Sequence, residues 1–182
     1  MNHGSPAWHC EINSPLIRDF IVLTPQLPVR RQWTLPDFEQ TEKIMRTVYK
    51  NFRGDPGRTC LTGFSYGAKA VFDFAVWAEE LSKRDPARTV SWAALWPVDE
   101  ANNEARSSCS VNRVWLHFGS WKPDLQKSTA GNLGLARSEA FRKEYPKTDR
   151  LYTDYTQFGY DHLATCAASY ADWRVYEWLL NS

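Results

Sequence analysis

The stretch Thr59-Cys60-Leu61-Thr62-Gly63-Phe64-Ser65-Tyr66-Gly67 decides the fold. Its apolar first part predicts a buried strand over about 58–64, and a helical apolar pattern begins at Tyr66. A Gly-x-Ser-x-Gly motif between a strand and a helix places its serine on a sharp, strained turn. We expect both glycines to be required, because a side chain at either position would crowd this reversal of the chain.

Short apolar runs alternate with amphipathic segments of helical length along the whole sequence. This alternation predicts one α/β domain over residues 1–182, with a mainly parallel sheet and helices on both faces. The five expected strands cover about 20–24, 58–64, 90–96, 111–118 and 150–155. The first of them is a continuous apolar run, which is typical of a strand buried on both faces.

Four main helices are expected between and after these strands. The first begins at Thr34 as N-cap, with Pro36 in its first turn and Asp37 completing a capping box. The second lies behind Ser65 and shares one apolar face, and the third covers about 135–145. The last runs over about 169–180, where Ser169 and Asp172 have the spacing of a capping box.

Bulk composition argues against several classes of function. Lys and Arg total 22 and Asp and Glu total 21, so no net field favours nucleic acid or an anionic membrane as a partner. No apolar run reaches the roughly 18 residues of a membrane span, and the N-terminus lacks the pattern of a signal peptide. These features predict a soluble, cytoplasmic protein, or a secreted one if a leader precedes Met1. The four cysteines lack Cys-x-x-Cys spacing, which predicts free thiols and no zinc site.

A serine hydroxyl needs a base that takes its proton as it attacks, and histidine usually supplies that base. Of the four histidines, His162 follows the last strand, where a Ser–acid–His chain order places the base. His3 and His9 precede the sheet. His117 falls inside a strand and is expected to be a hydrogen-bonded core residue.

The third catalytic residue should be a carboxylate at the end of a strand between Ser65 and His162, where it would orient the imidazole. Asp124 is the first acid after the strand 111–118 and is the chosen candidate. Asp99 and Glu100, after the preceding strand, are the alternatives. Asp161 neighbours His162 in sequence and is expected to point elsewhere.

An oxyanion hole needs two converging donors. We expect one to be the backbone N–H of Tyr66, the residue after the nucleophile, and the other to be the N–H of Ser5 in His3-Gly4-Ser5. Trp121 is expected to line the substrate pocket. Trp96 is expected to pack in the core, which is the commoner role of a strand tryptophan.

The segments 20–28, 58–67 and the Asp161-His162 loop with its closing helix resemble the α/β-hydrolase carboxylesterases. The closest likeness is to the branch of phospholipase/carboxylesterase, polyhydroxyalkanoate-depolymerase-like and "predicted peptidase" esterases. The resemblance implies a triad of Ser65, an acid and His162, and no metal or organic cofactor. It also implies a central strand between 20–24 and 58–64, followed by a Leu-His-Gly loop. His3-Gly4 resembles that loop, yet only two residues precede it.

Without that central strand, two sheet edges would carry unpaired backbone groups that another segment or another chain must cover. This favours association into a homo-oligomer. The expected activity is that of a serine esterase, which cleaves a small or medium carboxylic ester through an acyl-Ser65 intermediate. An acyltransferase or a peptidase would use the same residues. If the oxyanion hole is incomplete, we expect the chain to be a non-catalytic or weakly active binding module instead of an esterase.

Overall fold

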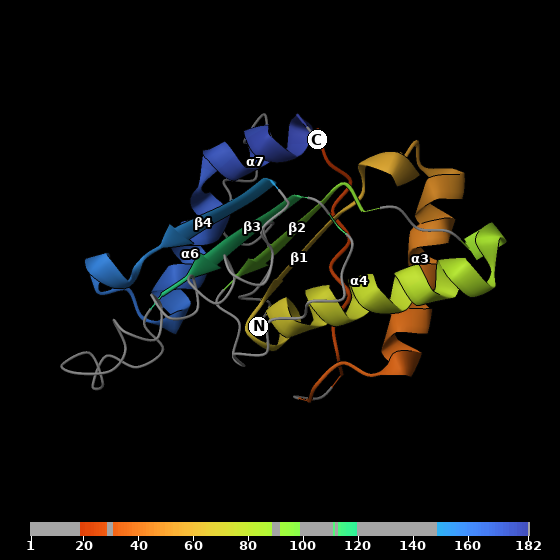
Figure 1. Cartoon of the computed structure of the whole chain (residues 1–182), viewed down its shortest axis with the longest axis horizontal. Coiled ribbons are helices and arrows are strands. Elements are labelled where there is room, and N and C mark those ends of the chain that lie inside the picture. Colours follow the sequence, from red (N-terminus) through yellow and green to blue (C-terminus); the bar gives the residue numbers. More distant parts are fainter. Residues whose placement is uncertain are drawn as a thin grey trace.

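A four-stranded, all-parallel sheet with helices on both faces forms the fold (Figure 1). The computed structural model describes residues 19–28, 31–88, 92–98, 111, 113–119 and 149–181. The strands are β1 (Cys60–Phe64), β2 (Ala94–Val98), β3 (Arg113–Phe118) and β4 (Asp149–Asp154), in the order β1-β2-β3-β4. The helices are α3 (Leu35–Asn51), α4 (Tyr66–Arg84), α6 (His162–Ala171) and α7 (Trp173–Leu180), with short 3₁₀ turns at Pro56–Arg58, Pro86–Arg88 and Thr156–Phe158. The α/β class and the parallel sheet are therefore confirmed.

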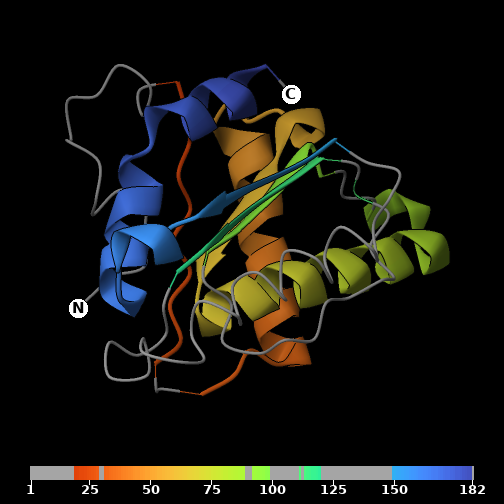
Figure 2. The same cartoon turned by 60° about the vertical axis from the view of Figure 1, so that its left-hand side comes forward.

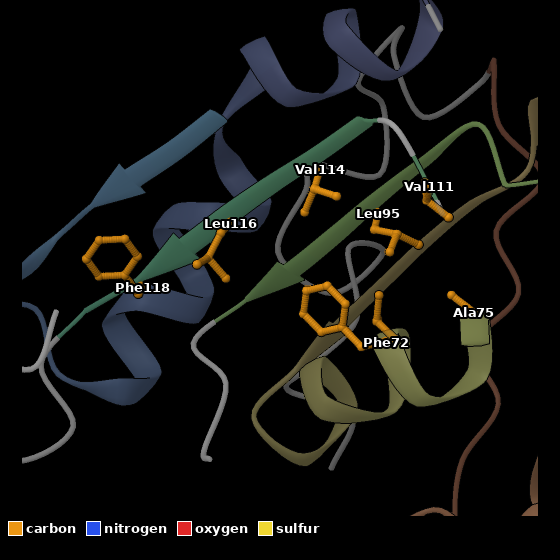
Figure 3. Packing of buried hydrophobic residues seen from close by; sticks show 8 residues of the cluster. Phe72, Ala75, Leu95, Val111, Val114, Leu116 and Phe118 are labelled. Carbon is orange, nitrogen blue, oxygen red and sulfur yellow. The ribbon is translucent and has the colours of Figure 1, made fainter. Parts of the chain in front are cut away.

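One face of the sheet packs against α4. The inward side chains of this layer are Val71, Phe72 and Ala75 from α4, Leu95 from β2, Val111, and Val114, Leu116 and Phe118 from β3 (Figure 3). Residues of β3 at every second position contribute, which is the period of a strand. The expected helix behind Ser65 is confirmed, because its Ala68 and Ala75 are fully buried and allow the close approach to the sheet.

The opposite face of the sheet packs against α6 and α7, as the view in Figure 2 makes clear. Its cluster is Ala94, Trp96 and Val98 of β2 with Cys166, Tyr170, Val175, Tyr176 and Leu179 of the two helices. Trp96 is 1% exposed, so its expected place in the core is confirmed. All five residues of β2 are buried, because this strand has a neighbour on each edge and a helical layer on each face.

The N-terminus of α3 follows the sequence prediction closely. Thr34 is the N-cap, Pro36 lies in the first turn, and both halves of the capping box with Asp37 are present. The Asp37 carboxylate also binds Arg31 at 2.6 Å, and the hydrogen bonds from Arg31 and Thr34 lower its pKa. The helix packs on α4 through Phe38 and Phe74, whose ring centroids are 5.3 Å apart.

The expected strand over 20–24 is wrong: this stretch is not part of the sheet. Ile21, Val22 and Leu23 are 51%, 39% and 36% exposed, although the sequence predicts burial on both faces. The physical reason lies in pairing, because a strand needs a neighbour and no described strand lies between 20–24 and β1.

The prediction of a single closing helix over 169–180 is also wrong. The structure has two separate helices there, α6 and α7, which are divided at Asp172. Asp172 ends α6 with an extended backbone and caps α7 by accepting a hydrogen bond from the Arg174 N–H at 3.1 Å. Ser169 is not an N-cap: it lies inside α6, where its hydroxyl donates to the Thr165 carbonyl. The expected helix over 135–145 lies outside the described residues.

Candidate active site

Ser65 occupies the turn between β1 and α4 with a strained backbone. Its φ of 59° and ψ of −114° make it the only non-glycine residue with positive φ in the part of the chain that the structure describes. Such a conformation costs on the order of 1–3 kcal/mol and persists where the surrounding structure enforces it, often at functional sites. The strained strand-to-helix turn that the sequence predicts at Ser65 is therefore present.

The two glycines of the motif have different roles. A Cβ built on Gly63 would overlap the Gly67 carbonyl and lie 3.0 Å from the Ala68 nitrogen, so only glycine lets β1 and α4 approach this closely. A Cβ on Gly67 would meet no atom within 4 Å. The expectation that both positions exclude a side chain is thus confirmed for Gly63 and wrong for Gly67, because Gly67 borders an open cavity.

His162 is brought to the serine turn by the start of α6. Its imidazole packs on the ring of Phe64, with ring centroids 4.2 Å apart, and Phe64 immediately precedes Ser65. Sequence reasoning missed this role of Phe64, although an aromatic residue at the second position of the motif was the available signal. The structure therefore places the His162 ring against the residue that directly precedes Ser65.

Two features fix where His162 lies. Asp161 caps α6, since its carboxylate accepts the Ala164 N–H at 2.7 Å, and this use of the side chain agrees with the expectation that it points elsewhere. Gly119, at the end of β3, allows α6 to come close, because a Cβ there would overlap the Thr165 hydroxyl. His162 is therefore held at the start of a capped helix that packs against the end of a strand.

The N-terminus of α4 supplies a donor beside the serine. Tyr66 is the first residue of this helix, and the first N–H groups of a helix have no partner within it. In the described part of the chain, the carbonyl of Ser65 accepts from Ala68 and Lys69, and the Tyr66 N–H donates to no residue. The positive end of the α4 dipole also favours a developing negative charge at this position.

Several expected site residues fall outside the described residues: Asp124, its alternatives Asp99 and Glu100, Ser5 and Trp121. The strands that precede the candidate acids do end near Ser65. β2 ends at Val98, whose carbonyl accepts the Ser65 N–H at 3.0 Å, and β3 lies next to β2 in parallel register. Loops at the carboxyl ends of neighbouring parallel strands share one edge of a sheet, which is the usual place of an α/β active site.

His117 plays a structural role in β3. It is fully buried among the rings of Trp96, Trp115 and Tyr155. Its core position is confirmed, but the expected hydrogen bond is wrong, because neither ring nitrogen has a partner in the described structure. Burial lowers the pKa of His117 to about 3, with Arg174 lowering it further and Asp172 opposing the shift.

This buried histidine predicts a pH-dependent stability. The unfolded chain binds a proton near pH 6.5 that the folded chain excludes until about pH 3, so stability is full above this window and falls as the pH decreases. Within the window the free energy of unfolding should fall by about 1.4 kcal/mol per pH unit from this group. Urea unfolding of the wild type and of His117→Phe at several pH values measures the difference. Equal pH slopes for the two proteins would show that His117 is not excluded from protonation.

In the stretches that the structure describes, no helix is both long and apolar enough to cross a membrane. No group of three or more His, Cys, Asp or Glu side chains there could hold a metal ion.

Comparison with known proteins adds no assignment. No family model matches the chain, and no curated protein matches its sequence. The evidence on function is therefore the α/β fold and the geometry around Ser65.

Proposed function

We propose that this chain is a serine hydrolase that cleaves a small or medium carboxylic ester. The observation that carries the proposal is the strained Ser65 turn between β1 and α4, with the His162 ring packed one residue away on Phe64. Residues held in such strained conformations cluster at active sites and ligand-binding sites. The resemblance of the flanking segments to the α/β-hydrolase carboxylesterases also supports a serine hydrolase.

In the proposed reaction, His162 takes the proton of the Ser65 hydroxyl as its oxygen attacks the ester carbonyl. The tetrahedral oxyanion is stabilised by the Tyr66 N–H, with the Ser5 N–H as the proposed second donor. His162 then protonates the leaving alcohol, and an acyl-Ser65 ester remains. Water, activated by His162, attacks this ester and releases the acid, which restores the serine.

Three further assignments complete the proposal. Asp124 is proposed to orient His162, and Trp121 to line the substrate pocket. Transfer of the acyl group to an alcohol or an amine instead of water would use the same residues, which makes acyltransferase or peptidase activity the neighbouring alternative. No cofactor is needed for any of these steps.

Turnover of 4-nitrophenyl acetate and butyrate by the purified chain tests the proposal. Ser65→Ala should remove the activity, because the nucleophilic oxygen is lost. Ser82→Ala is the matched control, because Ser82 lies near the other end of the same helix, where its hydroxyl donates to the Ala78 carbonyl. Activity that survives in Ser65→Ala would refute the proposal, and absence of activity in the wild type would favour a binding module.

A further inference from the structure

Phe64 is the last residue of β1, and its ring contacts the start of α6. Its backbone is held by the parallel ladder, because Phe64 pairs with Val98 and the N–H of the following Ser65 donates to the Val98 carbonyl at 3.0 Å. A residue held in this way cannot shift relative to the sheet without breaking the ladder. The phenyl ring is therefore attached to a fixed point of the sheet, one residue before the serine.

The side chain of Phe64 points to the sheet face that α6 and α7 cover. The preceding Gly63 faces the other way, since a Cβ there would overlap the Gly67 carbonyl at the start of α4, and successive strand residues alternate between the two faces. Phe64 accordingly packs against the cluster formed by β2, α6 and α7, which includes Cys166 of α6. Its ring thus contacts both this core and the imidazole of His162.

His162 has a fixed backbone but a side chain with two rotatable bonds. It is the first residue of α6, and Asp161 fixes this end of the helix. The Asp161 carboxylate accepts the Ala164 N–H at 2.7 Å, and the Asp161 carbonyl accepts the Thr165 N–H at 2.8 Å. The second side-chain bond of a histidine, which turns the ring about its own axis, has only a broad preference. Contacts with the ring therefore decide where its nitrogens point.

The contact between Phe64 and His162 is made by the faces of the two rings. Their centroids are 4.2 Å apart and their planes are inclined by 34°, which is closer to stacking than to an edge-to-face arrangement. Both imidazole nitrogens lie on the edge of the ring, and their hydrogen bonds are directed outward from that edge. A face contact therefore restricts the rotation of the imidazole without using the atoms that carry its proton.

A phenyl ring suits this position better than an aliphatic side chain. A leucine could fill much of the same space in the core, but its branched surface does not match one orientation of a flat imidazole. In the proposed reaction the imidazole also becomes positively charged when it takes the Ser65 proton. The face of a phenyl ring carries partial negative charge and attracts a cation within about 6 Å of its centre. The contact with Phe64 is therefore more favourable to the imidazolium than to the neutral ring.

We infer that Phe64 is a positioning residue: its ring holds the His162 imidazole by one face, in the orientation in which it takes the proton of Ser65. The inference rests on the proposed serine hydrolase activity and adds to it a residue that acts through His162. Loss of such a residue lowers the fraction of time in which the base is correctly oriented. It therefore lowers kcat and leaves KM nearly unchanged.

Phe64→Leu in the full chain, with 4-nitrophenyl butyrate as substrate, tests the inference. It should lower kcat by about tenfold to a hundredfold and change KM by less than about threefold, because a misplaced catalytic group costs rates of this order. Phe64→Tyr keeps the ring face and should retain kcat within about threefold. Phe38→Leu is the matched control, since it removes a buried phenyl ring from the packing of α3 on α4, and it should retain kcat within about twofold.

A double-mutant cycle with His162→Ala separates positioning from a merely structural role. If Phe64 acts through His162, Phe64→Leu should leave the residual rate of the His162→Ala protein unchanged, because no imidazole is left to orient. If the leucine instead disturbs the serine turn, it should lower this residual rate as much as it lowers the rate of the wild type. Such a loss, or full kcat in the single variant Phe64→Leu, would overturn the inference.

The NMR resonances of the His162 ring C–H protons report the contact without any turnover. Protons over the face of a phenyl ring are shielded, so these resonances should move downfield in Phe64→Leu and stay near their wild-type positions in Phe64→Tyr. Unchanged resonances in Phe64→Leu would also overturn the inference. Failure of the proposed function looks different: a wild type without ester turnover refutes the activity and the positioning role together, whereas an active wild type with a fully active Phe64→Leu refutes the positioning role alone.

Discussion

Replacing Ser65 or His162 with alanine is expected to reduce ester hydrolysis by about 10⁴-fold to 10⁶-fold, and replacing both should reduce it no further. The reason is that the two side chains act as one unit. Without the imidazole the serine hydroxyl keeps its proton, and without the hydroxyl the imidazole has no nucleophile to activate. The structure supports this coupling in so far as the His162 ring packs on Phe64, the residue that directly precedes Ser65.

The values of kcat/KM for 4-nitrophenyl butyrate, measured for the wild type, the two single variants and the double variant, test this prediction. His117→Phe is the control, because His117 is a core histidine of β3 and has no part in the proposed reaction. It should retain activity within a few-fold. A double variant that is far slower than either single variant would mean that the residues act independently, which would contradict the proposed mechanism.

The second large effect is expected at Gly63. Gly63→Ala should lower the free energy of unfolding by about 3 kcal/mol or more, because the new methyl group would overlap the Gly67 carbonyl at a place where two backbone segments touch. Neither segment can move without shifting β1 or the start of α4. The same shift would displace Ser65, so ester hydrolysis should fall as well.

Gly67→Ala is the matched control two residues beyond the serine. Its methyl group would meet no atom within 4 Å, and Gly67 lies in the first turn of a helix, so alanine should stabilise the chain by about 0.4–1 kcal/mol. Urea unfolding of both variants measures the difference. Similar losses of stability at the two positions would show that the close approach at Gly63 is not what holds the turn.

Local signals in the sequence predicted a large part of the fold. The capping box of Thr34 and Asp37, the serine turn and the apolar runs of β2, β3 and β4 each depend on neighbours within a few residues. Such patterns carry their own physical cause, because caps and strand–helix turns are satisfied by the segment itself. The sequence therefore placed Ser65 on the turn before α4, with Tyr66 as the first residue of that helix, without knowledge of the rest of the chain.

The failures occur where the outcome depends on distant segments. The run 20–24 is apolar enough for a strand, but a strand forms only against a partner, and β1 is not its neighbour. The start of α7 was misassigned because Asp172 can complete a capping box from Ser169 or act as a cap itself, and only the packing of Ser169 inside α6 decides. The proximity of His162 to Phe64 likewise depends on α6 packing at the end of the sheet.

Labelling of the folded chain with a fluorophosphonate, followed by mass spectrometry of the tryptic peptide 59–69, tests the central assignment most directly. The account predicts covalent modification of Ser65, stoichiometric in the wild type and lost both in urea-unfolded chain and in His162→Ala. Modification of another serine, or labelling of Ser65 that is as fast in unfolded as in folded protein, would contradict Ser65 as an activated nucleophile.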